Sequence, residues 1–217
     1  MFDAVLFDLD GTLADTAPDL GRCLNAVRAE QGLAPVALAQ LRPHTSSGVR
    51  GLLRAGMDVR PDHPEYATLA QRFLVHYAAG LCVDTQPYDG MESVLTQIEA
   101  RGLPWGIVTN KAARFTEPLV VALAWHCRAS CVVSGDTTPH AKPHPAPLLH
   151  AAQALKVAPE HCVYIGDDLR DIQAARAAGM ASIAAAWGYL GETHAIHDWG
   201  ADCVLDTPAA LPAALGL

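Results

Sequence analysis

Apolar and polar residues follow two different patterns along this chain. Residues 4–7 form a continuous apolar run, which is typical of a strand buried on both faces of a parallel sheet. From residue 15 to about residue 85 there is no convincing strand, and residues 66–77 carry apolar side chains at helical spacing. From Gln86 onward, short apolar strands alternate with amphipathic helices. The pattern predicts a parallel sheet covered on both faces, with a helical block inserted after its first strand.

The boundaries of the predicted elements follow from the same pattern. Further strands are expected at residues 105–109, 131–133, 162–165, 181–186 and 203–205, and helices at 91–98, 115–123, 147–155 and 169–178. A short helix is expected at the end of the chain. The fold class is therefore α/β, with a Rossmann-like parallel-sheet core made by residues 1–14 and 86–217. Residues 15–85 are predicted to form an inserted all-α helical cap.

The sequence predicts the local structure of two parts of the cap. Its first helix is expected to begin at Thr16 as N-cap, with Pro18 in the first turn and Asp19 favoured there by the helix dipole. Residues 43–50 contain proline, serine, threonine and glycine and are predicted to be a loop.

Composition and charge narrow the possible partners. With 51% hydrophobic and 18% charged residues, the 217-residue chain is typical of a globular protein. Its formal net charge of −8 argues against a general affinity for nucleic acid or for an anionic membrane. No apolar run reaches membrane-spanning length, and the start of the chain does not resemble a signal peptide. We therefore expect a cytoplasmic protein, monomeric or homodimeric, whose six scattered cysteines are thiols.

Polar residues that could carry chemistry stand where the predicted strands end. Asp8 and Asp10 follow the first strand, and Gly11 allows a sharp turn directly after them. Two carboxylates this close are costly unless a cation lies between them or one holds a proton. Thr109 and Asn110 follow the second core strand. Because ligands of open α/β sheets bind outside the carboxyl ends of the strands, these residues are candidates for one site.

Two later segments extend this set. Lys142 stands directly before a proline, which biases its backbone toward an extended conformation. Gly166, Asp167, Asp168 and Asp171 follow another predicted strand. Each residue alone has an ordinary explanation, such as a surface lysine or first-turn acids favoured by the helix dipole. Their joint occurrence at strand ends indicates a functional site.

These residues and their order resemble the haloacid dehalogenase-like hydrolases. Asp8-x-Asp10-Gly11-Thr12 matches the first motif of that family, Thr109 the second, Lys142 the third, and Gly166-Asp167-Asp168 with Asp171 the fourth. The resemblance covers the whole chain, since the helical block looks like that family's inserted cap. Asp10 disfavours halide displacement, because the dehalogenases proper have no aspartate at that position.

Within the family, two kinds of phosphatase are similar to this chain. Residues 134–137, 142–145 and 187–189 look most like bacterial phosphoglycolate phosphatases. Residues 47–50 and 199–202 resemble the related N-acetylmuramic acid 6-phosphate phosphatases. A sugar phosphomutase of the same superfamily is a further alternative, since such an enzyme returns the phosphoryl group to a sugar.

The resemblance implies a Mg²⁺-dependent phosphatase acting on a small carboxylate-bearing phosphomonoester, with 2-phosphoglycolate as the leading substrate. Asp8 would bind the metal and attack phosphorus, forming an aspartyl-phosphate. The backbone carbonyl of Asp10 and the carboxylate of Asp167 would complete the protein ligands. The side chain of Asp10 would protonate the leaving alcohol and later accept a proton from water.

The remaining candidates would bind the substrate or orient other groups. Thr109 and the neighbouring amide of Asn110 would bind phosphoryl oxygens, and Lys142 would stabilise their charge in the transition state. Asp168 or Asp171 would orient Lys142 or a metal-bound water, and the sequence leaves open which does so. In the cap, Arg50 with Ser47 and Gly48 is a candidate for binding a substrate carboxylate. The alternative for Arg50 is an ordinary surface arginine.

Overall fold

The computed structural model describes residues 2–191 and 194–217. Its main sheet has six parallel strands in the order β5-β4-β1-β6-β7-β8. They are β1 (Ala4–Phe7), β4 (Trp105–Val108), β5 (Cys131–Val133), β6 (Cys162–Gly166), β7 (Ala181–Ala185) and β8 (Cys203–Leu205). The predicted α/β fold with a parallel-sheet core is confirmed.

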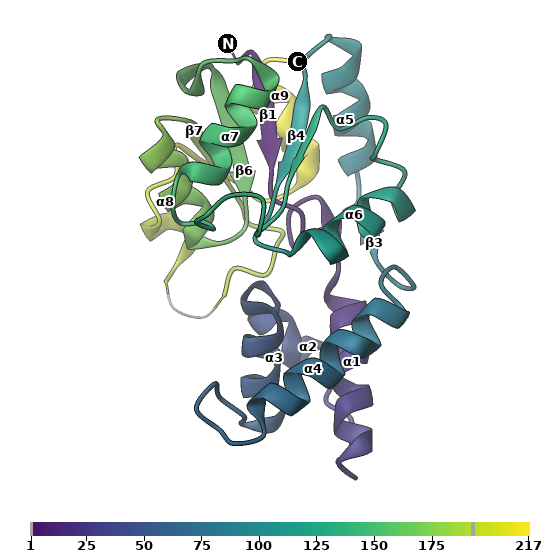
Figure 1. Ribbon diagram of the computed structural model, residues 1–217. Coiled ribbons are helices and arrows are strands. Elements are labelled where there is room, and N and C mark those ends of the chain that lie inside the picture. Colours follow the sequence, from purple (N-terminus) through teal and green to yellow (C-terminus); the bar gives the residue numbers. More distant parts are fainter. Residues whose placement is uncertain (1, 192–193) are drawn as a thin grey trace.

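Helices cover both faces of this sheet (Figure 1). They are α5 (Met91–Ala100), α6 (Ala113–Ala122), α7 (Ala146–Leu155), α8 (Leu169–Ala178) and α9 (Leu211–Leu215). In β1, Val5 and Phe7 pack into the apolar cluster beneath α5 and α9, whereas Ala4 and Leu6 pack into the cluster beneath α7 and α8. Successive side chains of a strand point to opposite faces, so both faces of β1 must be apolar.

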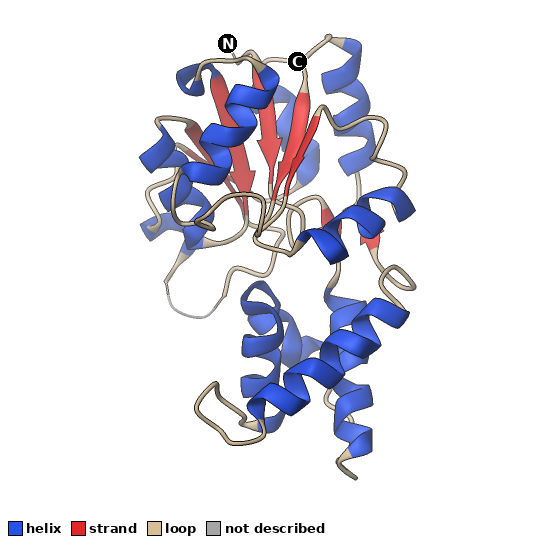
Figure 2. Cartoon of the chain, viewed as in Figure 1, coloured by secondary structure: helices blue, strands red, loops and turns tan. Residues whose placement is uncertain are grey.

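A second group of helices lies beyond the carboxyl ends of the strands (Figure 2). It consists of α1 (Ala17–Glu30), α2 (Leu38–Leu41), the 3₁₀ helix η1 (Arg42–Ser47), α3 (Gly48–Met57) and α4 (Tyr66–Ala79). These helices share an apolar cluster that includes Leu24, Leu52 and Phe73. The chain termini lie at the opposite end of the sheet (Figure 1). Among the described residues, no helix is both long enough and apolar enough to cross a membrane.

Two short antiparallel strands join the helical group to the sheet. They are β2 (Ala14–Asp15) and β3 (Gln86–Pro87). Thr16 stands at the N-cap of α1, but its side chain makes no capping hydrogen bond there. Its Oγ1 donates instead to Asp10, 2.6 Å away. Asp19 is completely buried and accepts hydrogen bonds from residues 83–85, beside β3.

The prediction of a loop over residues 43–50 is wrong. This segment contains most of η1 and the first turn of α3. The proline of η1 lies in its first turn, where its missing N–H leaves no hydrogen bond unmade. Gly48 has a φ of 56° and connects the two helices, a conformation that glycine adopts without steric cost. The turn-forming residues therefore act here at helix boundaries.

Candidate active site

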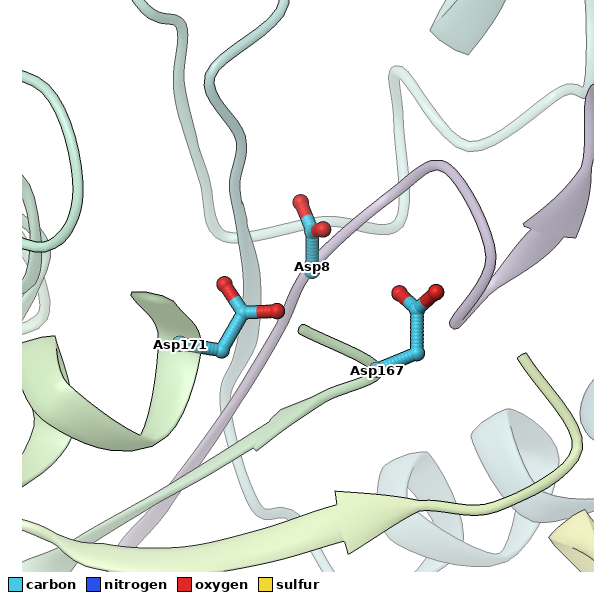
Figure 3. A group of neighbouring side chains, drawn as sticks. All are labelled: Asp8, Asp167 and Asp171. Atoms are coloured by element: carbon cyan, nitrogen blue, oxygen red, sulfur yellow. The ribbon is translucent and has the colours of Figure 1, made fainter. Parts of the chain in front are cut away.

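Three carboxylates that are far apart in the sequence meet at the carboxyl end of the sheet. Asp8 follows β1, Asp167 follows β6, and Asp171 lies in the first turn of α8. Each offers a carboxylate oxygen, and these atoms lie within 4.8 Å of one another (Figure 3). Strands β1 and β6 are adjacent and parallel, so the residues that follow them emerge at the same edge.

Asp167 is held rigidly in this group. It is 0% exposed, and it accepts hydrogen bonds from Thr12 Oγ1 at 2.9 Å and from the amide of Tyr189 at 2.8 Å. A Cβ on Gly11 would lie 2.2 Å from Asp167 Oδ2, so the loop after β1 can approach only because residue 11 is glycine. Burial, together with the charges of Asp8 and Asp171, raises the pKa of Asp167 well above its ordinary value.

These carboxylates fit a hard divalent cation. Asp8 Oδ1 is buried and has no hydrogen bond within the described part of the chain. The possible metal-ligand atoms in this cluster are all carboxylate oxygens, and oxygen ligands are those that Mg²⁺ and Ca²⁺ prefer. Besides burial, repulsion from Asp8 and Asp171 raises the pKa of Asp167, and a cation among these carboxylates would offset that repulsion.

Lys142 is buried between two of these carboxylates. Its Nζ lies 2.9 Å from Asp8 Oδ1, close enough for an ion pair although not in hydrogen-bond geometry, and 2.7 Å from Asp171 Oδ1. It also donates to the Val108 carbonyl at 2.9 Å and to the Tyr164 hydroxyl at 2.6 Å. Burial disfavours the ammonium ion, but the charges of Asp171 and Asp8 outweigh it and raise the pKa of Lys142. A fixed positive charge therefore lies beside Asp8.

The two residues after β4 have different surroundings. Thr109 is buried, and its Oγ1 accepts a hydrogen bond from the amide of Lys111 at 3.2 Å. The Asn110 side chain donates to the Lys142 carbonyl and accepts from the Lys142 amide, both at 2.9 Å. Its amide group thus positions the segment that carries Lys142. The expected binding of phosphate at Asn110 rests on its backbone N–H.

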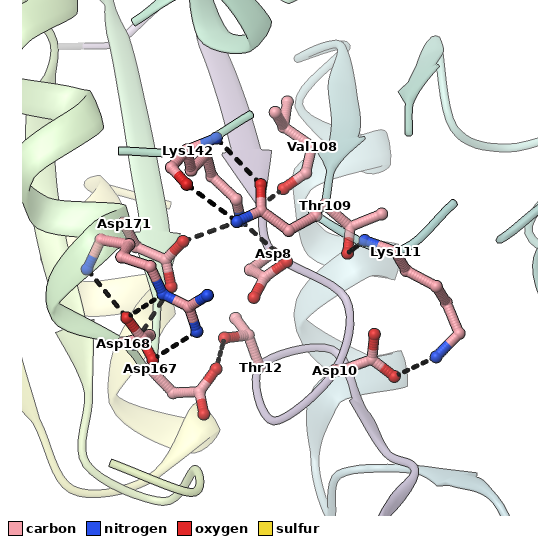
Figure 4. Close-up of polar contacts among 12 residues, drawn as sticks. Asp8, Asp10, Thr12, Val108, Thr109, Lys111, Lys142, Asp167, Asp168 and Asp171 are labelled. Atoms are coloured by element: carbon pink, nitrogen blue, oxygen red, sulfur yellow. Dashed lines mark hydrogen bonds and ion pairs between the residues drawn. The ribbon is translucent and has the colours of Figure 1, made fainter. Parts of the chain in front are cut away.

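Asp10 lies apart from the three clustered carboxylates. Its Oδ1 accepts from Lys111 Nζ at 2.7 Å, as Figure 4 shows, and from Thr16 Oγ1 at 2.6 Å. The Lys111 ammonium also lies 4.8 Å from the centre of the Tyr77 ring. Burial opposes the charge of Lys111, but the ion pair with Asp10 raises its pKa. Sequence reasoning did not assign a role to Lys111, although its position directly after Thr109 and Asn110 was a signal.

Asp168 and Asp171 have distinct contacts. Asp171 forms the ion pair with Lys142 described above. Asp168 is the N-cap of α8 and pairs with the Arg170 guanidinium through two contacts of 2.8 Å. Arg170 Nη2 also donates to the carbonyl of Ser46, 2.7 Å away in η1. Asp168 therefore holds an arginine that contacts the helical group, a contact that the sequence pattern did not reveal.

A cavity of about 320 Å³ lies between the sheet and the helical group. Its polar lining includes Asp8, Asp10, Thr109, Asn110, Lys111, Lys142, Asp168, Arg170 and Asp171. Its apolar lining includes Leu20, Val49, Phe73, Leu74, Tyr77 and Phe115. Ser47 and Gly48 also line this cavity, whereas Arg50 lines a second one of about 440 Å³. Arg50 is exposed to solvent.

Known proteins are similar to this chain over most of its length. The family model described as haloacid dehalogenase-like hydrolase matches residues 5–185. A phosphoglycolate phosphatase from Xanthomonas campestris is 46% identical over 209 residues, which cover 96% of this chain and 94% of that protein. An N-acetylmuramic acid 6-phosphate phosphatase from Pseudomonas aeruginosa is 42% identical over 208 residues, with 96% and 92% covered.

Solved structures show the same architecture. A crystal structure described as a predicted phosphoglycolate phosphatase from Haemophilus somnus superposes with a TM-score of 0.87. Its sequence is 25% identical, and the match covers 99% of this chain and 98% of that one. Both the sheet and the helical group are therefore shared with that protein.

Proposed function

This chain belongs to the haloacid dehalogenase-like hydrolases and is a phosphoric monoester hydrolase, and we propose that its substrate is a small carboxylate-bearing phosphomonoester. The leading candidate is 2-phosphoglycolate, the substrate named for relatives at 44–46% identity. The observation that supports phosphoryl transfer at this site is the arrangement around Asp8. A buried cation, Lys142, lies beside a carboxylate oxygen that has no hydrogen bond within the described part of the chain.

We propose Mg²⁺ as the cofactor. The carboxylates of Asp8 and Asp167 and the backbone carbonyl of Asp10 would hold it, while Asp171 remains paired with Lys142. When bound, the cation would neutralise phosphoryl oxygens that otherwise repel the attacking carboxylate.

The residues of the chain account for two successive displacements. An Asp8 carboxylate oxygen attacks phosphorus, forming an aspartyl-phosphate as the ester bond to the leaving alcohol breaks. Asp10 in its protonated form gives that alcohol a proton, and the resulting carboxylate then accepts one from the water that attacks phosphorus and restores Asp8. Lys142 stabilises the negative charge on the phosphoryl oxygens, assisted by Thr109 and the backbone N–H of Asn110.

The helical group would act as a cap domain, which we assign to residues 15–85. It closes the cavity on the side opposite Asp8, through residues such as Val49, Phe73 and Leu74. Closure over the site would exclude bulk water and strengthen the electrostatic interactions inside. The small-molecule substrate is the proposed partner, and the formal net charge of −8 supports our proposal that no nucleic acid or membrane binds. We also propose that the protein is cytoplasmic.

The apolar lining favours a second candidate substrate. A two-carbon acid phosphate offers almost no apolar surface, yet the cavity presents Phe73, Leu74 and Phe115. An N-acetylmuramic acid 6-phosphate, with its methyl-bearing substituents and its carboxylate, matches such a mixed lining better. The relative from Pseudomonas aeruginosa is named for that substrate.

One experiment ranks these candidates. The purified protein is assayed with Mg²⁺ for phosphate release from 2-phosphoglycolate, N-acetylmuramic acid 6-phosphate and a hexose phosphate without a carboxylate. We expect the highest kcat/KM with one of the two carboxylate-bearing esters. A higher value with the hexose phosphate would contradict the substrate class. Phosphoryl transfer that depends on an added sugar bisphosphate, without release of free phosphate, would indicate a phosphomutase.

A further inference from the structure

The second cavity is lined by several positively charged side chains. It lies beside the catalytic cavity and has a volume of about 440 Å³. Its lining includes four arginines, Arg50, Arg54, Arg60 and Arg170. Among the described residues of its lining, Asp168 is the one acidic side chain. This concentration of positive charge occurs in a chain whose formal net charge is −8.

Within the described part of the chain, packing does not offset the charges of Arg50 and Arg60. Arg50 and Arg54 are four residues apart on α3, where two like charges face the same side of the helix and repel. Arg50 and Arg60 are exposed, and neither side chain makes an ion pair or hydrogen bond to residues 2–191 or 194–217. Asp168, the one acid among the described lining residues, is already paired with Arg170. A bound anion would compensate the charges of Arg50 and Arg60.

We propose that the second cavity is a binding site for a small oxyanion, a carboxylate or phosphoryl group, with Arg50 and Arg60 as its principal ligands. The planar guanidinium group matches the oxygens of such anions and can donate two parallel hydrogen bonds to them. Arg50 and Arg60 come from two different segments of the cap, α3 and the connection between α3 and α4. An anion held by both would therefore be recognised from two directions.

The anion could come from either of two sources. The two cavities share Ser47, Asp168 and Arg170 as lining residues. A substrate whose phosphate lies at Asp8 could extend past this shared wall and place a distant carboxylate in the second cavity. The other source is a separate small anion, such as inorganic phosphate. The first possibility rests on the proposed phosphatase function, whereas binding of an anion at this site does not.

Sulfate is a suitable probe, because it is a stable oxyanion that the enzyme cannot hydrolyse. We would titrate the metal-free protein with sulfate at constant ionic strength and follow the Nε–H NMR signals of Arg50 and Arg60. Neither residue lines the catalytic cavity, so these signals report on the second one. We expect saturable shifts, and about tenfold weaker binding in Arg60→Gln because one charged hydrogen-bond donor is lost. The control is Arg101→Gln at an exposed arginine following α5, which should leave sulfate binding unchanged.

Shifts that stay linear in sulfate, or that are equally affected by Arg60→Gln and Arg101→Gln, would overturn the proposed site. Kinetics then distinguish the sources. If the substrate supplies the anion, Arg60→Gln raises KM for a carboxylate-bearing sugar phosphate about ten times more than for p-nitrophenyl phosphate. If a separate anion binds, the KM values for both esters change by the same factor. Absence of any phosphatase activity would refute the proposed function and leave the sulfate result standing.

Discussion

The completely buried carboxylate of Asp19 offers a sharp test of how the cap is joined to the core. It lies in the first turn of α1 and accepts from the amides of Val83 and Thr85 at 3.1 and 2.9 Å, and from Thr85 Oγ1 at 2.6 Å. Arg22 donates to it as well, at 2.5 Å. Asp19 thus connects the segment that enters the helical group with the segment that leaves it. We predict that Asp19→Asn weakens this junction.

The size of the effect follows from the donors that lose a charged acceptor. A hydrogen bond to a charged group contributes about 1.5 to 3 kcal/mol, and a buried donor left unpaired costs about 1 to 3 kcal/mol. Thr85 is 2% exposed, so water cannot readily replace the carboxylate at its amide and hydroxyl. The substituted amide retains one acceptor oxygen, and contributions from one group are not additive. We therefore expect a loss of about 2 to 4 kcal/mol in the free energy of unfolding.

Urea unfolding at neutral pH measures this loss, and hydrogen exchange of the Asp84 and Thr85 amides locates it. Exchange at these amides should accelerate in Asp19→Asn, because both amides donate to the removed carboxylate. Asp89→Asn is the control, since Asp89 is an exposed aspartate just beyond β3. A change below about 0.5 kcal/mol, the usual effect of a surface substitution, would refute the reasoning.

The same carboxylate predicts a pH dependence. Burial disfavours its ionisation, but hydrogen bonds from Thr85 and Arg22 outweigh burial and lower the pKa of Asp19 below its ordinary value. A carboxylate with a lowered pKa stabilises the folded state above the ordinary aspartate pKa, and this contribution disappears as the pH falls through the lowered value. The difference in unfolding free energy between wild type and Asp19→Asn should therefore shrink on acidification. A difference that is constant with pH would contradict this assignment.

Further predictions concern the cavity lined by Asp8 and the mechanism proposed for it. Asp8→Asn should form no aspartyl-phosphate and lose turnover, and retention of a tenth of the wild-type rate would exclude the covalent mechanism. Exhaustive chelation should stop phosphate release and added Mg²⁺ should restore it; full activity after chelation would argue against the cofactor. Asp10→Asn should slow turnover by roughly 10² to 10⁴, measured with a poor leaving group. Arg50→Ala should reduce kcat/KM for a carboxylate-bearing substrate by roughly ten- to a hundredfold relative to p-nitrophenyl phosphate if it binds that carboxylate, whereas equal losses on both would indicate a structural role.

The sequence alone was sufficient to predict the fold and which polar residues follow the ends of its strands. The apolar run of β1, with Val5 and Phe7 on one face and Leu6 on the other, reflects burial on both faces, which is a local property of the chain. Because parallel strands direct their carboxyl ends to one edge, the polar residues after each strand could be assigned to one site. Asp8 and Asp167 lie together in the structure for this reason.

Contacts of individual side chains were decided only by the tertiary structure. Asp168 is the extended N-cap of α8 and Asp171 lies in its first turn, yet one binds Arg170 and the other Lys142. Neither spacing nor composition encodes which neighbour each carboxylate meets.

Side-chain contacts of the cap were even less predictable from the sequence. Asp19 and Thr85 are 66 positions apart, and only folding of the intervening helices brings the carboxylate to its donors. Arg50 follows Gly48 by two residues, but the helical turn between them turns it away from the cavity that holds Asp8 and into the neighbouring one. Residue order determines which groups lie near the ends of strands, whereas helix packing determines which cavity each side chain enters.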